Sequence, residues 1–72
     1  MRNLAKLRED YEQRINEYEE HLRSMTENGT RHFRSEGNGP LADITSQITN
    51  EYRRHIETYA ALIAEIDAIL GV

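Results

Sequence analysis

The chain has 72 residues, no cysteine, and a net charge of −4 from 13 acidic and 9 basic side chains. A chain of this length forms one domain with a small core, so it usually needs a disulfide, a metal ion or a partner chain for stability. The lack of cysteine excludes disulfides and thiolate metal sites, and the negative charge argues against nucleic acid, whose phosphates require a basic surface.

Histidine spacing argues against a metal-binding protein, and hydropathy argues against a membrane-spanning one. The three histidines, at positions 21, 32 and 55, match no common metal-binding spacing, so we expect neither a metal ion nor another cofactor. No apolar run approaches the length of a membrane span. The first ten residues are charged rather than typical of a signal peptide, so we expect a cytoplasmic protein.

An amphipathic helix is predicted over about residues 3–27. The apolar side chains recur at steps of three and four residues, which places them on one face of a helix. They are Leu4, Leu7, Tyr11, Ile15, Tyr18, Leu22 and Met25. Asn28 and Gly29 follow, and both residue types favour the left-handed conformation that ends helices.

The segment 28–39 is predicted to be a loop, and it holds the candidate binding residues. Two arginines, a histidine and the only phenylalanine stand together as Arg31, His32, Phe33 and Arg34. Guanidinium groups beside an aromatic ring suit a carboxylate or phosphate, so the sequence predicts an acidic protein partner or a small anionic ligand here. The alternative is that Phe33 folds back and covers the end of the helix pair.

A second amphipathic helix is predicted over about residues 40–70. Pro40 suits the first position of a helix, and Gly71 is of the type that ends one. The apolar residues of this helix are Leu41, Ile44, Ile48, Tyr52, Ile56, Tyr59, Ile63, Ile66 and Leu70. Leu62 and Ile69 widen the apolar stripe beyond that of the first helix.

The two stripes match as an antiparallel pair, because facing residues should then have numbers with a constant sum. Met25 with Leu41 and Leu4 with Ile63 give 66 and 67, and the layers between them give the same values. In this register every tyrosine faces an aliphatic residue, which fills the layers evenly. The predicted fold is therefore all-α, a single domain over 1–72 that forms an antiparallel, coiled-coil-like two-helix hairpin.

The predicted register leaves part of the second helix without a partner in the chain. Its last turns extend beyond the first helix, and a row of alanines at steps of four lies away from the main stripe. The residues predicted to contact another copy are Ala60, Ala64, Ile66, Ala68, Ile69 and Leu70. We therefore expect a homo-oligomer, most simply a dimeric four-helix bundle. The alternative for the alanines is a solvated helix face, since alanine is the best helix former.

The sequence contains no arrangement of residues typical of catalysis. There is no nucleophile beside a base and no phosphate-binding loop, so we expect no enzyme and no catalytic residues. We expect His55 to be partly buried and bonded to Glu51, with a pH switch or a ligand-binding residue as the alternative. We expect the tyrosines to pack in the helix seam or, alternatively, to line a pocket between two hairpins. The sequence predicts an interaction protein of the inhibitor or adaptor type, with a binder of a small anion such as a nucleotide as the alternative.

Overall fold

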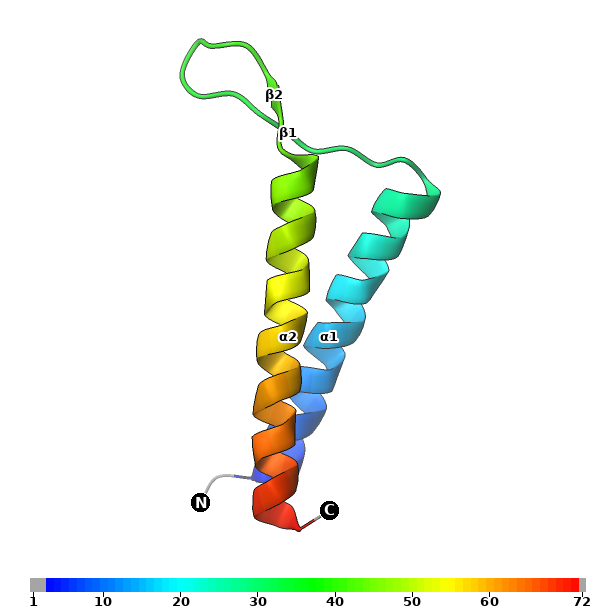
Figure 1. The fold of residues 1–72 in the computed structure, drawn as a ribbon, viewed down its shortest axis with the longest axis vertical. Helices are drawn as coiled ribbons and strands as arrows, with labels where there is room; N and C mark the ends of the chain where they lie inside the picture. The colour runs from blue at the N-terminus through cyan, green and yellow to red at the C-terminus, as the bar shows by residue number, and fades with distance from the viewer. Residues whose placement is uncertain (1–2, 72) are drawn as a thin grey trace.

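The computed structural model describes residues 3–71, which form a long helical hairpin (Figure 1). Helix α1 covers Leu4–Glu27 and helix α2 covers Thr45–Leu70, with two short strands, β1 at Phe33–Arg34 and β2 at Ala42–Asp43, between them. The two helices pack against each other in opposite directions, so that α1 begins where α2 ends. This arrangement confirms the predicted helical hairpin.

Helix α1 begins and ends within a residue of the predicted positions. Asn3 caps its start, because the Asn3 Oδ1 accepts a hydrogen bond from the Lys6 backbone N–H at 3.0 Å and so satisfies one of the unpaired N–H groups of the first turn. At the other end, the Asn28 N–H donates to the Ser24 carbonyl at 2.9 Å. Gly29 follows with a φ of 64°, a conformation that glycine adopts at little cost.

Helix α2 begins five residues later than predicted. The predicted start at residue 40 is wrong, because residues 42–43 form strand β2 and Pro40 lies in the connection between the strands. The Thr45 N–H donates to the Asp43 Oδ1 at 2.9 Å, so an aspartate just outside the helix satisfies its first turn. Gly71 ends α2 as predicted, with a φ of 78° and its N–H donating to the Asp67 carbonyl at 2.9 Å.

A two-stranded antiparallel ribbon, which the prediction did not contain, connects the helices. Phe33 pairs with Asp43, and Arg34 pairs with Ala42. The turn between the strands contains Gly37 with a φ of 61°, where a side chain would be strained. Residues 33–43 are named the ribbon from here on. Figure 1 shows the ribbon beyond the first turn of α2, pointing away from α1.

The helices pack about two helical turns away from the predicted register: the contacts of Met25 with Thr49 and of His21 with Tyr52 have residue numbers that sum to 74 and 73, against the predicted 66–67. Tyr11 contacts Tyr59 rather than Ile56, with ring centroids 5.2 Å apart, and Tyr18 contacts Tyr52 at 5.3 Å. The prediction that no layer pairs two tyrosines is therefore wrong. An apolar stripe repeats nearly every seven residues, so a shift of two turns presents the same kind of side chain to the other helix. Periodicity alone does not distinguish the two registers.

The hairpin is elongated and has a small core. Its radius of gyration is 16.3 Å and its longest axis is 51 Å, whereas a compact chain of this length has a radius of gyration of about 11 Å. Ile66 is the one apolar side chain buried among residues 3–71, with 5% of its surface exposed. The helices lie close together where α1 begins and diverge toward the ribbon (Figure 1). The core therefore lies at the end of the hairpin opposite the ribbon.

Candidate functional site

A set of polar contacts fixes the ribbon to the start of α2. Asp43 accepts hydrogen bonds from Arg31 Nε at 2.7 Å and from the Thr45 N–H at 2.9 Å, and the Thr45 hydroxyl also donates to it. Thr45 Oγ1 accepts from the His32 N–H at 2.9 Å, and the Ile44 N–H donates to the His32 carbonyl at 2.9 Å. The Thr45 hydroxyl and N–H, together with the Arg31 guanidinium, lower the pKa of Asp43 to about 2. The ribbon is thus a braced element rather than an unstructured loop.

Two large apolar side chains of the ribbon face solvent. Phe33 is 55% exposed and Leu41 is 70% exposed. The alternative prediction, in which Phe33 covers the end of the helix pair, is therefore wrong. Directly paired residues of an antiparallel ribbon point to the same side, so Phe33 shares its side with Asp43, and Arg34 shares the other with Ala42. Phe33 and Arg34 consequently point in opposite directions.

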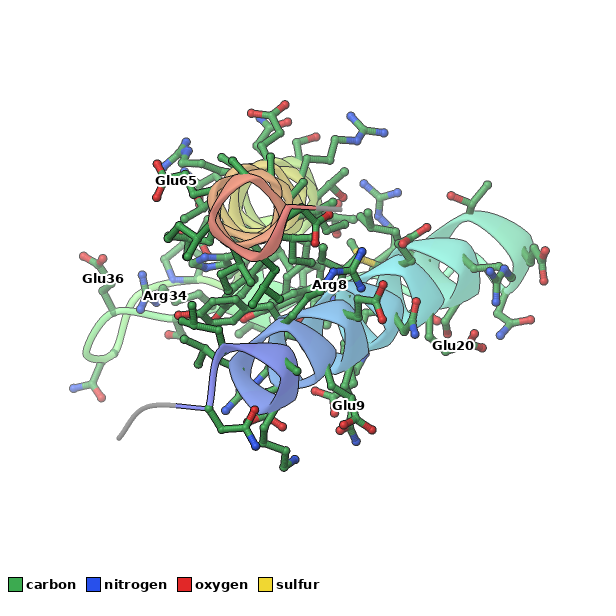
Figure 2. All side chains as sticks on the ribbon, turned by 90° about the horizontal axis from the view of Figure 1, so that it is seen from below. Arg8, Glu9, Glu20, Arg34, Glu36 and Glu65 are labelled. Atoms are coloured by element: carbon green, nitrogen blue, oxygen red, sulfur yellow. The ribbon has the colours of Figure 1, made fainter. Side chains whose placement is uncertain are left out.

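Arg34 lines a groove of about 420 Å³ between the ribbon and α2. The other lining residues are Glu36, Gly39, Pro40, Ala42, Ile44 and Gln47. Figure 2 shows Arg34 and Glu36 together on the ribbon. Among residues 3–71, no carboxylate lies within ion-pair distance of the Arg34 guanidinium. The four predicted binding residues are therefore divided: Arg31 and His32 brace the ribbon, whereas Phe33 and Arg34 are exposed to solvent.

An ion pair joins the two helices at the end opposite the ribbon. Arg8 donates to Asp67 through Nε at 2.6 Å and through Nη2 at 3.3 Å, and its Nη1 donates to Glu12 at 2.6 Å. Hydrogen bonds to Asp67 and Glu12 raise the pKa of Arg8, and the bond from Arg8 lowers the pKa of Asp67. This flank of the hairpin is named the bridge side. Figure 2, a view along the hairpin, shows Arg8 on one flank and Glu65 on the other.

Six aromatic rings form a continuous cluster along the helix seam. The ring centroids are separated by 5.2 Å in Tyr11–Tyr59, 6.3 Å in Tyr18–Tyr59, 5.3 Å in Tyr18–Tyr52, 5.1 Å in Tyr18–His55 and 5.5 Å in His21–Tyr52. At about 100° per residue, His21 and His55 lie on the flank opposite Arg8 and Asp67. This flank is named the aromatic side.

The aromatic cluster corrects one prediction and reveals a signal in the sequence. His55 is exposed and stacks on Tyr18 with ring centroids 5.1 Å apart, and within residues 3–71 it forms no hydrogen bond with Glu51. Both helices contain the pattern Tyr-x-x-His, at residues 18–21 and at residues 52–55. In an antiparallel pair this repeat places each histidine beside the tyrosine of the other helix, so the pattern could have indicated the true register.

The structure separates the residues predicted to contact another copy. Ile66 is buried within the hairpin, so the prediction that it lacks a partner in its own chain is wrong. Exposed residues of the predicted set are Ile69 at 69%, Leu70 at 45%, and Ala60, Ala64 and Ala68. Ala60 and Ile69 are nine residues apart, which places them about 180° apart around α2. Ala60 thus lies toward the bridge side and Ile69 toward the aromatic side, so the predicted set covers two sides of α2.

A second groove, named the α1 groove, lies at the end of the hairpin opposite the ribbon. Its volume is about 480 Å³, and its lining residues are Asn3, Lys6, Leu7, Asp10 and Tyr11. Lys6 Nζ lies 2.6 Å from Asp10 Oδ1, and this hydrogen bond raises the pKa of Lys6. By helix angle the groove faces the aromatic side. The sequence analysis did not predict it, because it treated Leu7 and Tyr11 only as core residues.

No family model, no curated protein and no solved structure matches this chain. Within residues 3–71, there is no group of three or more histidine, cysteine, aspartate or glutamate side chains that could hold a metal ion. Neither helix in this part of the chain has both the length and the apolar character needed to cross a membrane. The features that the structure offers for binding are the ribbon and the exposed flanks of the helices.

Proposed function

We propose that this protein is a non-enzymatic helical hairpin that associates with itself and binds a protein partner through its ribbon, as a cytoplasmic inhibitor or adaptor. The observation that carries the proposal is the exposure of Phe33 and Leu41 on a braced ribbon, at one end of a hairpin with little core of its own. The two activities use different surfaces of the molecule.

The accessible surface supports self-association. The chain exposes 5743 Å², whereas a globular monomer of 8.4 kDa exposes about 4,600 Å². The excess of about 1,100 Å² exceeds the roughly 800 Å² that each partner buries in a stable interface. One interface between two copies would therefore bring the exposed surface per chain into the range of ordinary proteins.

Sedimentation velocity from micromolar to millimolar concentration tests this part of the proposal. We expect a dimer or a higher oligomer that dissociates on dilution, with helix content falling as it dissociates. A fully helical monomer across the whole range would overturn the proposed self-association and would leave the ribbon as the only surface with a proposed role.

The ribbon supports recognition of a protein partner. Exposed large apolar side chains mark interaction sites when they stand together, and aromatic anchors dominate the binding energy of many interfaces. Because the brace around Asp43 already orders the ribbon, binding costs little further conformational entropy. Arg34 can pair with an acidic group of the partner, whereas Arg31 is already paired within the chain.

Affinity purification from extracts of the source cells tests the ribbon. The immobilised proteins are the wild type, Phe33→Ala, Leu41→Ala and the matched control Asn38→Ala, which alters an exposed residue of the same segment. We expect a protein that the wild type and Asn38→Ala retain and that both apolar variants lose. The proposal is wrong if every retained protein binds all four forms equally while their circular dichroism spectra agree.

A small anionic ligand such as a nucleotide is the second candidate, and the groove around Arg34 favours it. Two observations place it second: the Glu36 carboxylate lines the same groove, and the tyrosines that could stack on a base pack against one another in the seam. Millimolar ATP should raise the melting temperature of the wild type and of Arg54→Ala but not of Arg34→Ala. This candidate is eliminated if ATP fails to stabilise the wild type or stabilises Arg34→Ala equally.

A further inference from the structure

Building on the self-association proposed above, we infer that a second copy of this chain docks on the aromatic side, with Ile69 of each copy in the α1 groove of the other. The protruding side chain and the groove lie on the same flank and at the same end of the hairpin. Ile69 is 69% exposed in the last turn of α2. The α1 groove offers Leu7 and Tyr11 as apolar walls.

The register of the hairpin sets Ile69 and the groove at one level. Arg8 faces Asp67, so in an antiparallel pair the residue two positions beyond Asp67 is level with the residue two positions before Arg8. These residues are Ile69 and Lys6, and the His21–Tyr52 contact puts Ile69 level with Leu4 instead. Both positions lie at the start of α1, where Asn3, Lys6 and Leu7 line the groove. A two-fold axis parallel to the hairpin keeps every residue at its own level, so it brings each Ile69 to the groove of the other copy.

Two strips of residues with a seven-residue spacing extend this match along the aromatic side. The strip on α2 consists of His55, Leu62 and Ile69, and the strip on α1 consists of Leu7, Arg14 and His21. A seven-residue spacing keeps side chains on one line between two packed helices. The contacts between the helices put corresponding members of the two strips from one residue (Arg8 with Asp67) to six residues (Tyr11 with Tyr59) off level, so the strips lie beside each other across the interface with a stagger of less than two turns.

Charge also favours this arrangement. Glu65 lies between Leu62 and Ile69 in the sequence, and Figure 2 shows it on the flank opposite Arg8. Within residues 3–71 neither Glu65 nor Arg14 forms an ion pair. In the register set by Arg8 and Asp67, Arg14 of one copy lies four residues from the level of Glu65 of the other, a step that these two long side chains can span. A two-fold axis perpendicular to the hairpin at its middle would instead bring Ile69 to the ribbon end, away from the groove.

The bridge side is the less suitable face for the second copy. Its carboxylates Glu12 and Asp67 already pair with Arg8, and burying such a network would cost the hydration of every charge in it. The exposed apolar residues Leu70 and Ile69 lie in the last turn of α2, at the same end of the hairpin as the α1 groove. A second copy on the aromatic side covers Ile69 and leaves the paired charges in water.

Ile69→Asp tests the docking, and Ala60→Asp is its matched control on the opposite side of α2. The dimer buries two copies of Ile69, so Ile69→Asp should raise the dimer dissociation constant at least about 100-fold. Ala60→Asp should change it by less than about threefold. A dimer that survives Ile69→Asp or dissociates on Ala60→Asp would overturn the inferred face while leaving self-association in place. A wild type that is monomeric throughout would overturn both.

A charge-reversal pair tests the orientation. Homodimers of Arg14→Glu and of Glu65→Arg place like charges at both contacts, so each variant alone should dimerise about threefold to tenfold more weakly than the wild type. In a mixture, the heterodimer has one reversed pair and one native pair, and native mass spectrometry should show it in excess over both homodimers. A statistical mixture, with no preference for the heterodimer, would contradict the inferred orientation. An ion pair formed within one chain could not produce this rescue.

Discussion

At the end where α1 begins, side-chain packing and the Arg8–Asp67 ion pair join the helices, and the one buried apolar residue of the described chain, Ile66, lies there. At the ribbon end the helices diverge, and the order comes from hydrogen bonds among Asp43, Thr45 and His32, which span at most 13 residues of the sequence. The first end depends on contacts such as Arg8–Asp67 between residues 59 apart in the chain, whereas the second depends on these shorter separations. The two ends should therefore fail under different perturbations.

Ile66→Ala should have the largest effect, because it empties the packed end. Deleting buried methyl groups of this kind costs about 2–5 kcal/mol, which is a large share of the stability of a small domain. We expect the circular dichroism melting transition to move to a much lower temperature or to disappear. Leu41→Ala, at a position 70% exposed, is the control and should change the free energy of unfolding by less than about 0.5 kcal/mol. Equal losses from both variants would show that the core is placed wrongly.

Asp67→Asn should have the next largest effect, again at the packed end. It removes the charge that Arg8 contacts through two nitrogens, while Arg8 keeps its bond to Glu12. The melting temperature should fall, but by less than for Ile66→Ala, because the ion pair is partly exposed and screened by solvent. Glu57→Gln, an exposed substitution on the same helix, is the control. If the two variants melt together, the ion pair contributes nothing to holding the helices.

Acid should weaken both ends, and the variants separate their contributions. The pKa of Asp67 is lowered and that of Asp43 is lowered to about 2, both from an ordinary 3.8. The folded state then binds these protons less readily than the unfolded state, so the stabilisation is present above about pH 4 and is lost as the pH falls toward about 2. Melting curves across this range should be less pH-dependent in Asp67→Asn and in Asp43→Asn than in the wild type. Identical slopes in all three proteins would contradict these contributions.

Asp43→Asn should have the smallest global effect, because it acts on the ribbon alone. The brace around Thr45 loosens, so hydrogen exchange at the His32 and Ile44 amides should become faster. Amides in the middle of α2 should keep their protection. Asp10→Asn, which breaks an exposed ion pair on α1, is the control and should leave the ribbon amides unchanged. Faster exchange throughout both helices would mean that the ribbon and the core are coupled after all.

The helices were predictable because the signals that define them lie within a few residues. The pattern of apolar residues and the residues Asn28 and Gly29 gave the extent of α1, and Gly71 gave the end of α2. The start of α2 was not predictable from Pro40, whose preference for the first helical position competes with the pairing of residues 33–34 and 42–43. That pairing depends on contacts about ten residues apart, which local rules do not include.

The register and the candidate site depend on contacts over longer distances, and there the sequence was less informative. Two apolar stripes fit together almost equally well two turns apart, and the choice is made by the aromatic contacts and by Arg8 with Asp67. Arg31 seemed available for a ligand because Asp43, its partner, lies outside the segment predicted to be the loop. Only the Tyr-x-x-His repeat carried information about the register that could have been used.

The placement of both helix termini at one end of the molecule has a practical consequence. The longest axis measures 51 Å, and the ribbon lies at the far end of it from the start of α1 and the end of α2 (Figure 1). A fluorescent protein, a resin or a sensor surface attached beside either helix terminus would be held away from the ribbon by more than the width of a small domain, which is about 30 Å. The length of the hairpin therefore separates the attachment point from the ribbon, so immobilised protein leaves the ribbon accessible to a binding partner in solution.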